Sequence, residues 1–121
     1  MGHMDQPQSP DLTVLIVEPV ETTQRLLEVV LREVASRRFV AAGPDEARTI
    51  LERESADIVV LEPQVPTGLS WDFLDEMVAR DIPTVVLTSR ADDWVLADAA
   101  QHGATAVVTK PFPPADLKTI I

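Results

Sequence analysis

Cysteine is absent from the 121 residues of this sequence. Its absence excludes disulfide bonds, catalytic thiolates and cysteine-ligated zinc. Histidine is scarce, because one of the two histidines, His3, lies in an opening Met-Gly-His-Met segment that has the character of a cloning remnant. With His102 as the remaining histidine, the sequence contains no pattern typical of a Ser-His-Asp hydrolase or a zinc metalloprotease.

Basic residues are outnumbered: ten Lys and Arg against twenty Asp and Glu give a formal net charge of -10. A negative surface repels phosphate backbones and anionic lipid headgroups, so neither nucleic acid nor a membrane is expected as a partner. No apolar run approaches the ~20 residues that are needed to span a bilayer. We therefore expect a cytoplasmic protein that contacts other proteins or cations.

Five apolar runs alternate with segments whose apolar residues recur every three or four positions. The runs are rich in β-branched residues and are typical of strands buried on both faces, whereas the spacing is typical of amphipathic helices. The predicted strands are residues 12–17, 39–42, 58–61, 84–87 and 104–108. The predicted helices cover residues 26–34, 45–54, 73–78 and 91–101, with a short last helix that starts at Pro113 and Pro114. We expect Ser70 to cap the third helix and Gly103 to end the fourth in the left-handed conformation.

The alternation of five strands and five helices indicates the α/β class. Short connections between such elements specify right-handed crossovers and a parallel sheet that is covered on both faces. Residues 1–11 are expected to be the cloning remnant and a flexible leader, and residues 12–121 to form one domain. In a sheet of this kind the functional crevice lies beyond the carboxyl ends of the strands.

Three ionisable residues follow three different predicted strands: Glu18, Glu62 and Lys110. They are expected to converge, so that the lysine neutralises a carboxylate while the Thr88 hydroxyl donates a hydrogen bond into the same pocket. This set is either a buried polar network or the remains of a site. The segment around Pro19, after the first strand, contains no glycine, which excludes a glycine-rich phosphate loop there.

Four sequence pieces stand at these strand ends: VLIVEP (14–19), DIVVLEPQVP (57–66), PTVVLTS (83–89) and GATAVVTKPF (103–112). In this order they resemble the receiver domain of two-component response regulators, from about residue 12 to residue 121. The resemblance implies a flavodoxin-like (βα)5 three-layer sandwich, whose five-stranded parallel sheet has the order 2-1-3-4-5. It also implies a signalling module without an enzymatic reaction of its own.

The sequence departs from that family at two places. In the family an aspartate after the third strand is phosphorylated, and an acidic pair after the first strand helps to bind magnesium. Here Glu62 matches the phosphorylated aspartate and Pro19 matches the second acid, while Glu18, Thr88 and Lys110 are retained. Proline offers no side-chain oxygen to the octahedral shell that Mg²⁺ requires, so no cofactor is expected and Mg²⁺ binding should be weak or absent.

Two interpretations of Glu62 remain open. Its carboxylate is expected to reach toward Lys110 and Thr88 and to imitate part of a phosphoryl group, or else it forms only a structural ion pair with the lysine. The first functional hypothesis is a degenerate receiver that works through protein contacts without phosphorylation. The alternative is an active phosphoacceptor in a phosphorelay.

The resemblance also implies a face for partners, made of the fourth helix, the fifth strand and the fifth helix. The candidate contact residues are Trp94, Val95, Val107 and Lys118. Val107 matches a position where the family commonly has an aromatic residue that moves on activation, and a β-branched aliphatic side chain cannot make that movement. An attached effector or kinase domain, a separate protein or a second copy of the chain could bind to this face, while Trp94 could instead be a partly buried packing residue.

We expect three further residues to have structural roles or to border the crevice. Trp71 is expected in the loop before the third helix, as a packing residue. His102 is expected at the negative end of the fourth helix dipole. Arg90 borders the crevice and could pair with Glu62 or with an incoming acid.

Overall fold

The computed structural model describes residues 11–90 and 92–121. Five parallel strands form the central sheet in the order β2-β1-β3-β6-β7, which is the predicted order 2-1-3-4-5 once the strands of this sheet are counted alone. The strands are β1 (Thr13–Val17), β2 (Arg37–Ala41), β3 (Ile58–Leu61), β6 (Thr84–Thr88) and β7 (Ala106–Thr109). The predicted fold class is confirmed.

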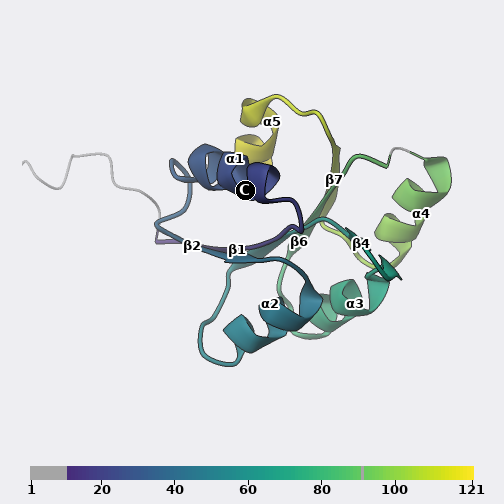
Figure 1. Cartoon of the computed structure of the whole chain (residues 1–121), viewed down its shortest axis with the longest axis horizontal. Helices are drawn as coiled ribbons and strands as arrows, with labels where there is room; N and C mark the ends of the chain where they lie inside the picture. Colours follow the sequence, from purple (N-terminus) through teal and green to yellow (C-terminus); the bar gives the residue numbers. More distant parts are fainter. Residues whose placement is uncertain (1–10, 91) are drawn as a thin grey trace, which may run out of the picture.

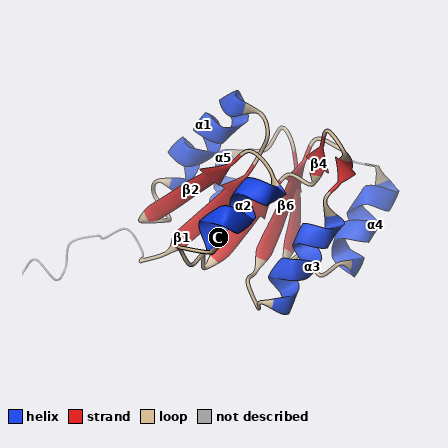
Figure 2. Cartoon of the chain, turned by 60° about the horizontal axis from the view of Figure 1, so that its bottom comes forward, coloured by secondary structure: helices blue, strands red, loops and turns tan. Residues whose placement is uncertain are grey.

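Helices cover both faces of the sheet, which gives three layers (Figures 1 and 2). One face carries α1 (Glu21–Leu31) and α5 (Pro114–Ile120). The other face carries α2 (Pro44–Leu51), α3 (Trp71–Ala79) and α4 (Asp93–Gln101). No helix in the described part of the chain is long and apolar enough to cross a membrane.

The apolar run of β1 explains why the strand is buried on both faces. Val14 and Ile16 belong to the hydrophobic cluster beneath α1 and α5, whereas Leu15 and Val17 belong to the cluster beneath α2 and α3. Successive side chains of a strand point to opposite faces, so a strand between two helical layers must be apolar at every position. This arrangement places β1 inside the sheet, between β2 and β3.

Several predicted boundaries shift by a few residues. The fourth helix was expected from about Ala91, which lies outside the described residues, and α4 begins at Asp93. Gly103 has the left-handed φ of 92°, as predicted, and a Cβ at this position would lie 2.9 Å from Val78 Cγ2. Ser70 occupies the N-cap position of α3, but its side chain does not cap the helix; its hydroxyl donates instead to the Pro63 carbonyl at 2.9 Å.

A small hairpin between β3 and α3 was not predicted. It consists of β4 (Gln64–Val65) and β5 (Gly68–Leu69), which pair in antiparallel fashion. Gly68 has φ 126°, a conformation that a residue without a Cβ adopts readily. The strands of two residues are too short to give an alternating pattern, so the sequence indicated only a connection.

Candidate functional site

The carboxyl ends of β1, β3 and β7 bring Glu18, Glu62 and Lys110 together. The backbone amide of Glu62 donates to the Val17 carbonyl at 2.9 Å, and that of Lys110 donates to the Thr88 carbonyl at 2.8 Å. These bonds extend the parallel ladder by one residue past each strand, so the three side chains project from the same edge of the sheet. The predicted convergence is confirmed.

Lys110 links the two carboxylates. Its Nζ lies 2.7 Å from Glu18 Oε1 and 3.1 Å from Glu62 Oε1. The carboxylates are 1% and 6% exposed, and the lysine side chain is 18% exposed. Buried charges require such partners, because desolvation of an unpaired carboxylate costs several kcal/mol. One ammonium group is thus shared between two carboxylates.

The second oxygen of each carboxylate is also occupied. Glu18 Oε2 accepts the backbone amide of Val20 at 3.0 Å, and Glu62 Oε2 accepts that of Gln64 at 3.1 Å. Each carboxylate therefore accepts one hydrogen bond from the lysine and one from a backbone amide two residues further along the chain. Sequence reasoning missed these amide donors, because only the conformation of the loops after β1 and β3 directs them at the carboxylates.

Thr88 is buried at the end of β6, but it takes no part in the ion network. Its Oγ1 accepts the backbone amide of Arg90 at 3.1 Å, and no hydrogen bond in the described ranges joins this hydroxyl group to Glu62 or to the Lys110 side chain. The expectation that Thr88 donates into the pocket toward Glu62 is wrong, because its hydroxyl is directed at the loop that follows its own strand.

Arg90 does not pair with Glu62 either. Its guanidinium binds Asp92 Oδ2 at 2.7 Å and Gln64 Oε1 at 3.1 Å, and it lies over the Trp94 ring, 5.0 Å from the centroid. Arg90 thus connects the hairpin after β3 to the start of α4. The acidic group of Asp92 and the amide group of Gln64 are the partners of this guanidinium, in place of the carboxylate in the pocket.

Pro19 follows Glu18 and adds no side-chain oxygen to the pocket. Between residues 11 and 121, Ala91 apart, no three His, Cys, Asp or Glu side chains lie close enough together to hold a metal ion. The carboxylates that do approach each other, Glu18 and Glu62, both face Lys110 Nζ. The site contains an ammonium group at the place where the two carboxylates meet.

The four candidate contact residues do not share one surface. Trp94 is 51% exposed, but Val95 is fully buried, so its choice as a contact residue is wrong: it is on the inner side of α4. Val107 is partly buried and packs against the cluster beneath α2 and α3. Lys118 donates to Glu33 Oε2 at 2.7 Å, and this hydrogen bond lowers the pKa of Glu33.

Trp71 and His102 join α3 to the end of α4. Trp71 is the first residue of α3, not part of the preceding loop, and its ring stacks on His102 with a centroid distance of 5.5 Å. His102 is the C-cap of α4, as predicted, and its Nδ1 lies 2.7 Å from Asp75 Oδ1. Both residues therefore have packing partners within the domain.

Comparison with known proteins identifies the family. The pattern of the response regulator receiver domain matches residues 14–121. The chain is similar to the phosphate regulon transcriptional regulatory protein PhoB of Klebsiella pneumoniae, with 29% identity over 108 residues that cover 86% of this chain and 47% of that protein. It is similar to the probable transcriptional regulator ycf27 of Cyanophora paradoxa, with 30% identity over 109 residues that cover 89% and 46% of the two proteins.

A solved structure agrees with this assignment. The receiver domain of the sensor histidine kinase PA1611 from Pseudomonas aeruginosa PAO1, with magnesium coordinated in its active site cleft, has a TM-score of 0.78 and 25% identity. The match covers 90% of this chain and 93% of that one. The chain spans about half the length of the two curated relatives. It belongs to the family of response regulator receiver domains, the signalling modules of two-component systems.

Proposed function

We propose that this receiver domain acts in signal transduction through protein contacts and without phosphorylation. The observation that carries the proposal is the position of Lys110, whose Nζ binds both Glu18 and Glu62 at 2.7 and 3.1 Å. In the family the matching lysine contacts the phosphoryl group. Here the domain's own carboxylates already engage it.

The position of Glu62 does not suit a phosphoryl acceptor. Both of its oxygens accept hydrogen bonds, one from Lys110 and one from the Gln64 amide. Its side chain is one methylene longer than the aspartate that the family phosphorylates, so its carboxylate lies elsewhere than the family's nucleophile. Phosphoryl transfer depends on in-line positioning and on neutralisation of the developing charge, and the longer side chain reduces the first contribution.

The residues around Glu18 do not fit magnesium. Mg²⁺ demands near-octahedral oxygen ligation, and Pro19 provides no side-chain oxygen. Glu18 itself accepts hydrogen bonds from Lys110 and from the Val20 amide, so a cation would have to compete with an ammonium group 2.7 Å away. We propose that the domain has no metal cofactor and acts without one.

Glu62 imitates a phosphoryl group only in part. It provides a negative charge beside Lys110, but it does not contact Thr88, the other residue that meets the phosphoryl group in the family. A carboxylate also has fewer oxygens and less charge than a phosphoryl group. We therefore propose that Glu62 holds the strand ends in one fixed conformation and that it does not reproduce an activated state.

The partners are proposed from the relatives and from the shape of the domain. PhoB and ycf27 are named as transcriptional regulators, and the matched region makes up 47% and 46% of these proteins. By analogy, an attached effector domain or a separate protein would contact the face formed by α4, β7 and α5. Trp94, 51% exposed on α4, is the candidate anchor that the structure leaves accessible.

The test is incubation with acetyl phosphate and Mg²⁺, followed by intact mass measurement. The expected result is an unchanged mass at every incubation time. A receiver domain that retains the aspartate and the acidic pair of the family pattern, treated in parallel, is the positive control for the reagents. A gain of one phosphoryl group on the wild-type chain would overturn the proposal and favour the alternative, an active phosphoacceptor in a phosphorelay.

A further inference from the structure

The outer edge of β7 is open. β7 is the last strand of the sheet and pairs only with β6. Its four residues, Ala106–Thr109, include no charged side chain, whereas β2 at the opposite edge begins with Arg37 and Arg38. Charged residues on an edge strand discourage pairing with another chain, and an uncharged edge presents free backbone donors and acceptors. The two edges of this sheet are thus protected unequally.

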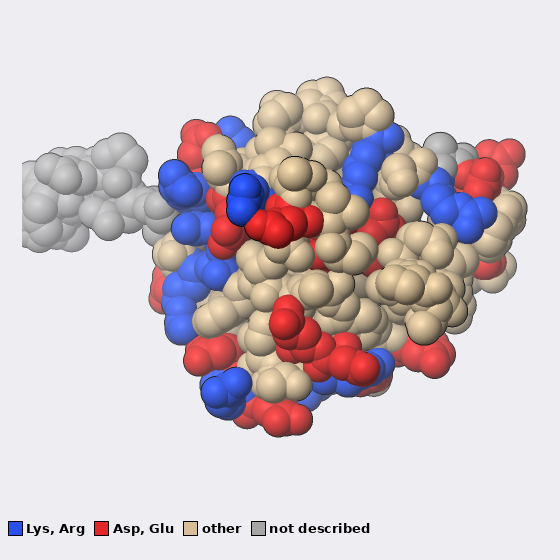
Figure 3. Space-filling view, viewed as in Figure 1, with Lys and Arg blue, Asp and Glu red and all other residues tan. Residues whose placement is uncertain are grey.

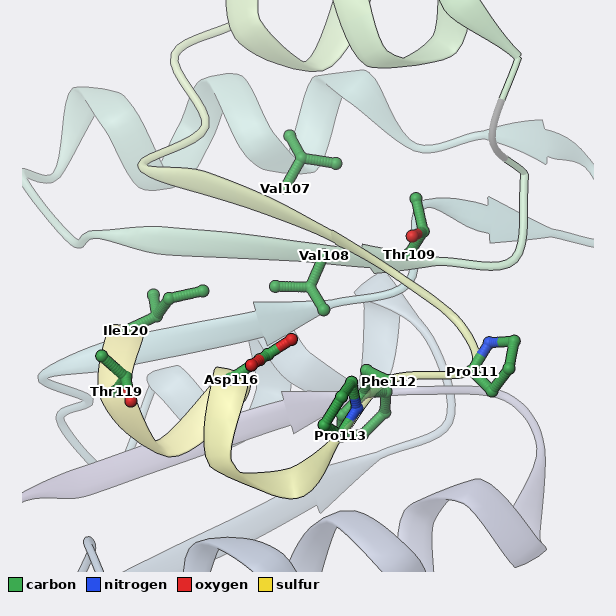
Figure 4. Close-up of a pocket in the computed structure, with 9 residues that line it drawn as sticks. All are labelled: Val107, Val108, Thr109, Pro111, Phe112, Pro113, Asp116, Thr119 and Ile120. Carbon is green, nitrogen blue, oxygen red and sulfur yellow. The ribbon is translucent and has the colours of Figure 1, made fainter.

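A groove of about 480 Å³ lies between β7 and α5 (Figure 4). Val107, Val108 and Thr109 all line it, although successive strand residues point to opposite faces. In Figure 4, Val107 and Thr109 point to one side of the strand and Val108 to the other. Side chains of both faces border the groove only if the groove reaches the edge of the strand. The backbone edge of β7 therefore lies within it.

The lining of the groove indicates what it would accept. Phe112, Pro113 and Ile120 give it an apolar wall, and Asp116 is its one charged lining residue. Asp116 is exposed and forms no ion pair with any described residue. Few charged side chains surround α5 on the surface in Figure 3. An apolar ligand with one positive charge complements this groove.

Proline limits the length of the pairing. Pro111 and Pro113 follow the strand and lack the backbone amide that a ladder needs. An added strand can therefore match only the four residues of β7 and the residues immediately beside them. A short extended segment fits this length.

We propose that the edge of β7 binds an extended segment of a partner protein by strand addition, with apolar side chains in the groove and a Lys or Arg beside Asp116. Backbone hydrogen bonds then provide affinity, and the alternate side chains provide specificity. This inference rests on the proposed function, because it names the mode by which the domain would bind its partner. A second copy is a poorer occupant, because it would bring another Asp116 and another net charge of -10.

The probe is a synthetic capped hexapeptide, acetyl-VTVKVT-amide, titrated to millimolar concentration into the ¹⁵N-labelled domain. The largest amide shifts are expected in β7 and at Asp116, with slower hydrogen exchange of β7 amides. Two control peptides keep the length: one has Glu in place of Lys, and one carries N-methyl groups on alternate residues, which removes backbone donors. Both controls should bind more weakly.

The matched protein variant is Asp116→Lys, which replaces an exposed residue in the first turn of α5; a circular dichroism spectrum equal to that of the wild type is the control for the fold. The substitution should weaken the binding of the Lys peptide and strengthen the binding of the Glu peptide, each by roughly two- to fivefold. This is the range expected for an exposed ion pair. Equal binding of the N-methylated peptide, shifts centred away from β7, or no shift at all would overturn strand addition. If sedimentation shows that the domain is a dimer and that the hexapeptide dissociates it, the groove binds a second copy of the chain. This result would overturn the proposal of a different partner protein.

A parallel titration after acetyl phosphate treatment separates this inference from the proposed function. If the domain acquires no phosphoryl adduct and does not bind the hexapeptide, strand addition is overturned and the proposed function is not. Binding that requires a phosphoryl adduct would support the surface and overturn phosphorylation independence. Binding of equal strength in treated and untreated samples, both without an adduct, supports both.

Discussion

The strand-end pocket and the edge of β7 are built in opposite ways. In the pocket, Lys110 and two backbone amides satisfy Glu18 and Glu62, and the carboxylates are almost fully buried. At the edge of β7 the backbone is open, the side chains are uncharged and Asp116 has no described partner. The place where the family carries out its chemistry is closed by the domain's own side chains, and the place next to it is available for contacts.

The largest change is expected when the pocket is returned to the family pattern. The double variant Pro19→Asp/Glu62→Asp should acquire a phosphoryl group from acetyl phosphate in the presence of Mg²⁺, because it regains both a metal ligand and a correctly placed nucleophile. Intact mass measurement reads the result. The single variant Glu62→Asp is the control and should stay unmodified, since Pro19 still withholds an oxygen. Magnesium-dependent modification of this single variant would contradict the role given to Pro19.

Removal of the shared cation should cost the most stability. Lys110→Ala leaves two buried carboxylates without their ammonium partner, so the free energy of unfolding should fall by about 3–5 kcal/mol, measured by urea denaturation. Lys118→Ala removes a lysine from an exposed pair with Glu33 and is the matched control, with a much smaller expected loss because solvent screens this pair. Equal losses in the two variants would show that the pocket is no more tightly organised than the surface.

The ion pair between Arg48 on α2 and Glu76 on α3 is a surface pair whose contribution to stability should depend on pH. The hydrogen bond from Arg48 lowers the pKa of Glu76 below its ordinary value of 4.5. This stabilisation is present above pH 4.5 and is lost as the pH falls through the lowered pKa of the folded state. Arg48→Met should therefore reduce the free energy of unfolding by roughly 0.2–1 kcal/mol at pH 7, and the difference from wild type should shrink under acid. A difference that grows as the pH falls would contradict this sign.

A similarly small effect on stability is expected at the surface anchor. Trp94 is 51% exposed and is stacked by Arg90, so Trp94→Ala should change the free energy of unfolding by about 0.5–1 kcal/mol at most. Trp71→Ala is the control, because Trp71 packs against the cluster beneath α2 and α3 and should cost more. If Trp94→Ala is the more damaging of the two, Trp94 is a packing residue, and the case for an anchor is lost.

The fold could be predicted because its signals are local. The last four residues of β1 are all apolar and buried, and Gly103 follows the C-cap residue of α4, so the apolar pattern predicts the strands and the glycine predicts the end of the helix. The ion network could be predicted at the level of residues, since Glu18, Glu62 and Lys110 all follow strands that end at one edge.

The remaining details depend on geometry that the residue pattern does not encode. The direction of the Thr88 hydroxyl is set by the loop to Arg90, and the amide of Gln64 meets Glu62 because of the short hairpin. The resemblance places Val95 on the partner face together with Trp94 because both lie early in the fourth helix, although adjacent residues on a helix face directions about 100° apart. Its burial follows from the packing of α4 on the sheet, which only the tertiary structure specifies.

The central claim is that the pocket is filled by its own charges. A crystal soaked in Mg²⁺ and beryllofluoride, a phosphoryl analogue, tests it most directly. The account predicts that Lys110 Nζ keeps its contacts with Glu18 and Glu62 and that neither ligand appears beside them. Magnesium bound at Glu18 together with beryllofluoride on Glu62 would contradict the account.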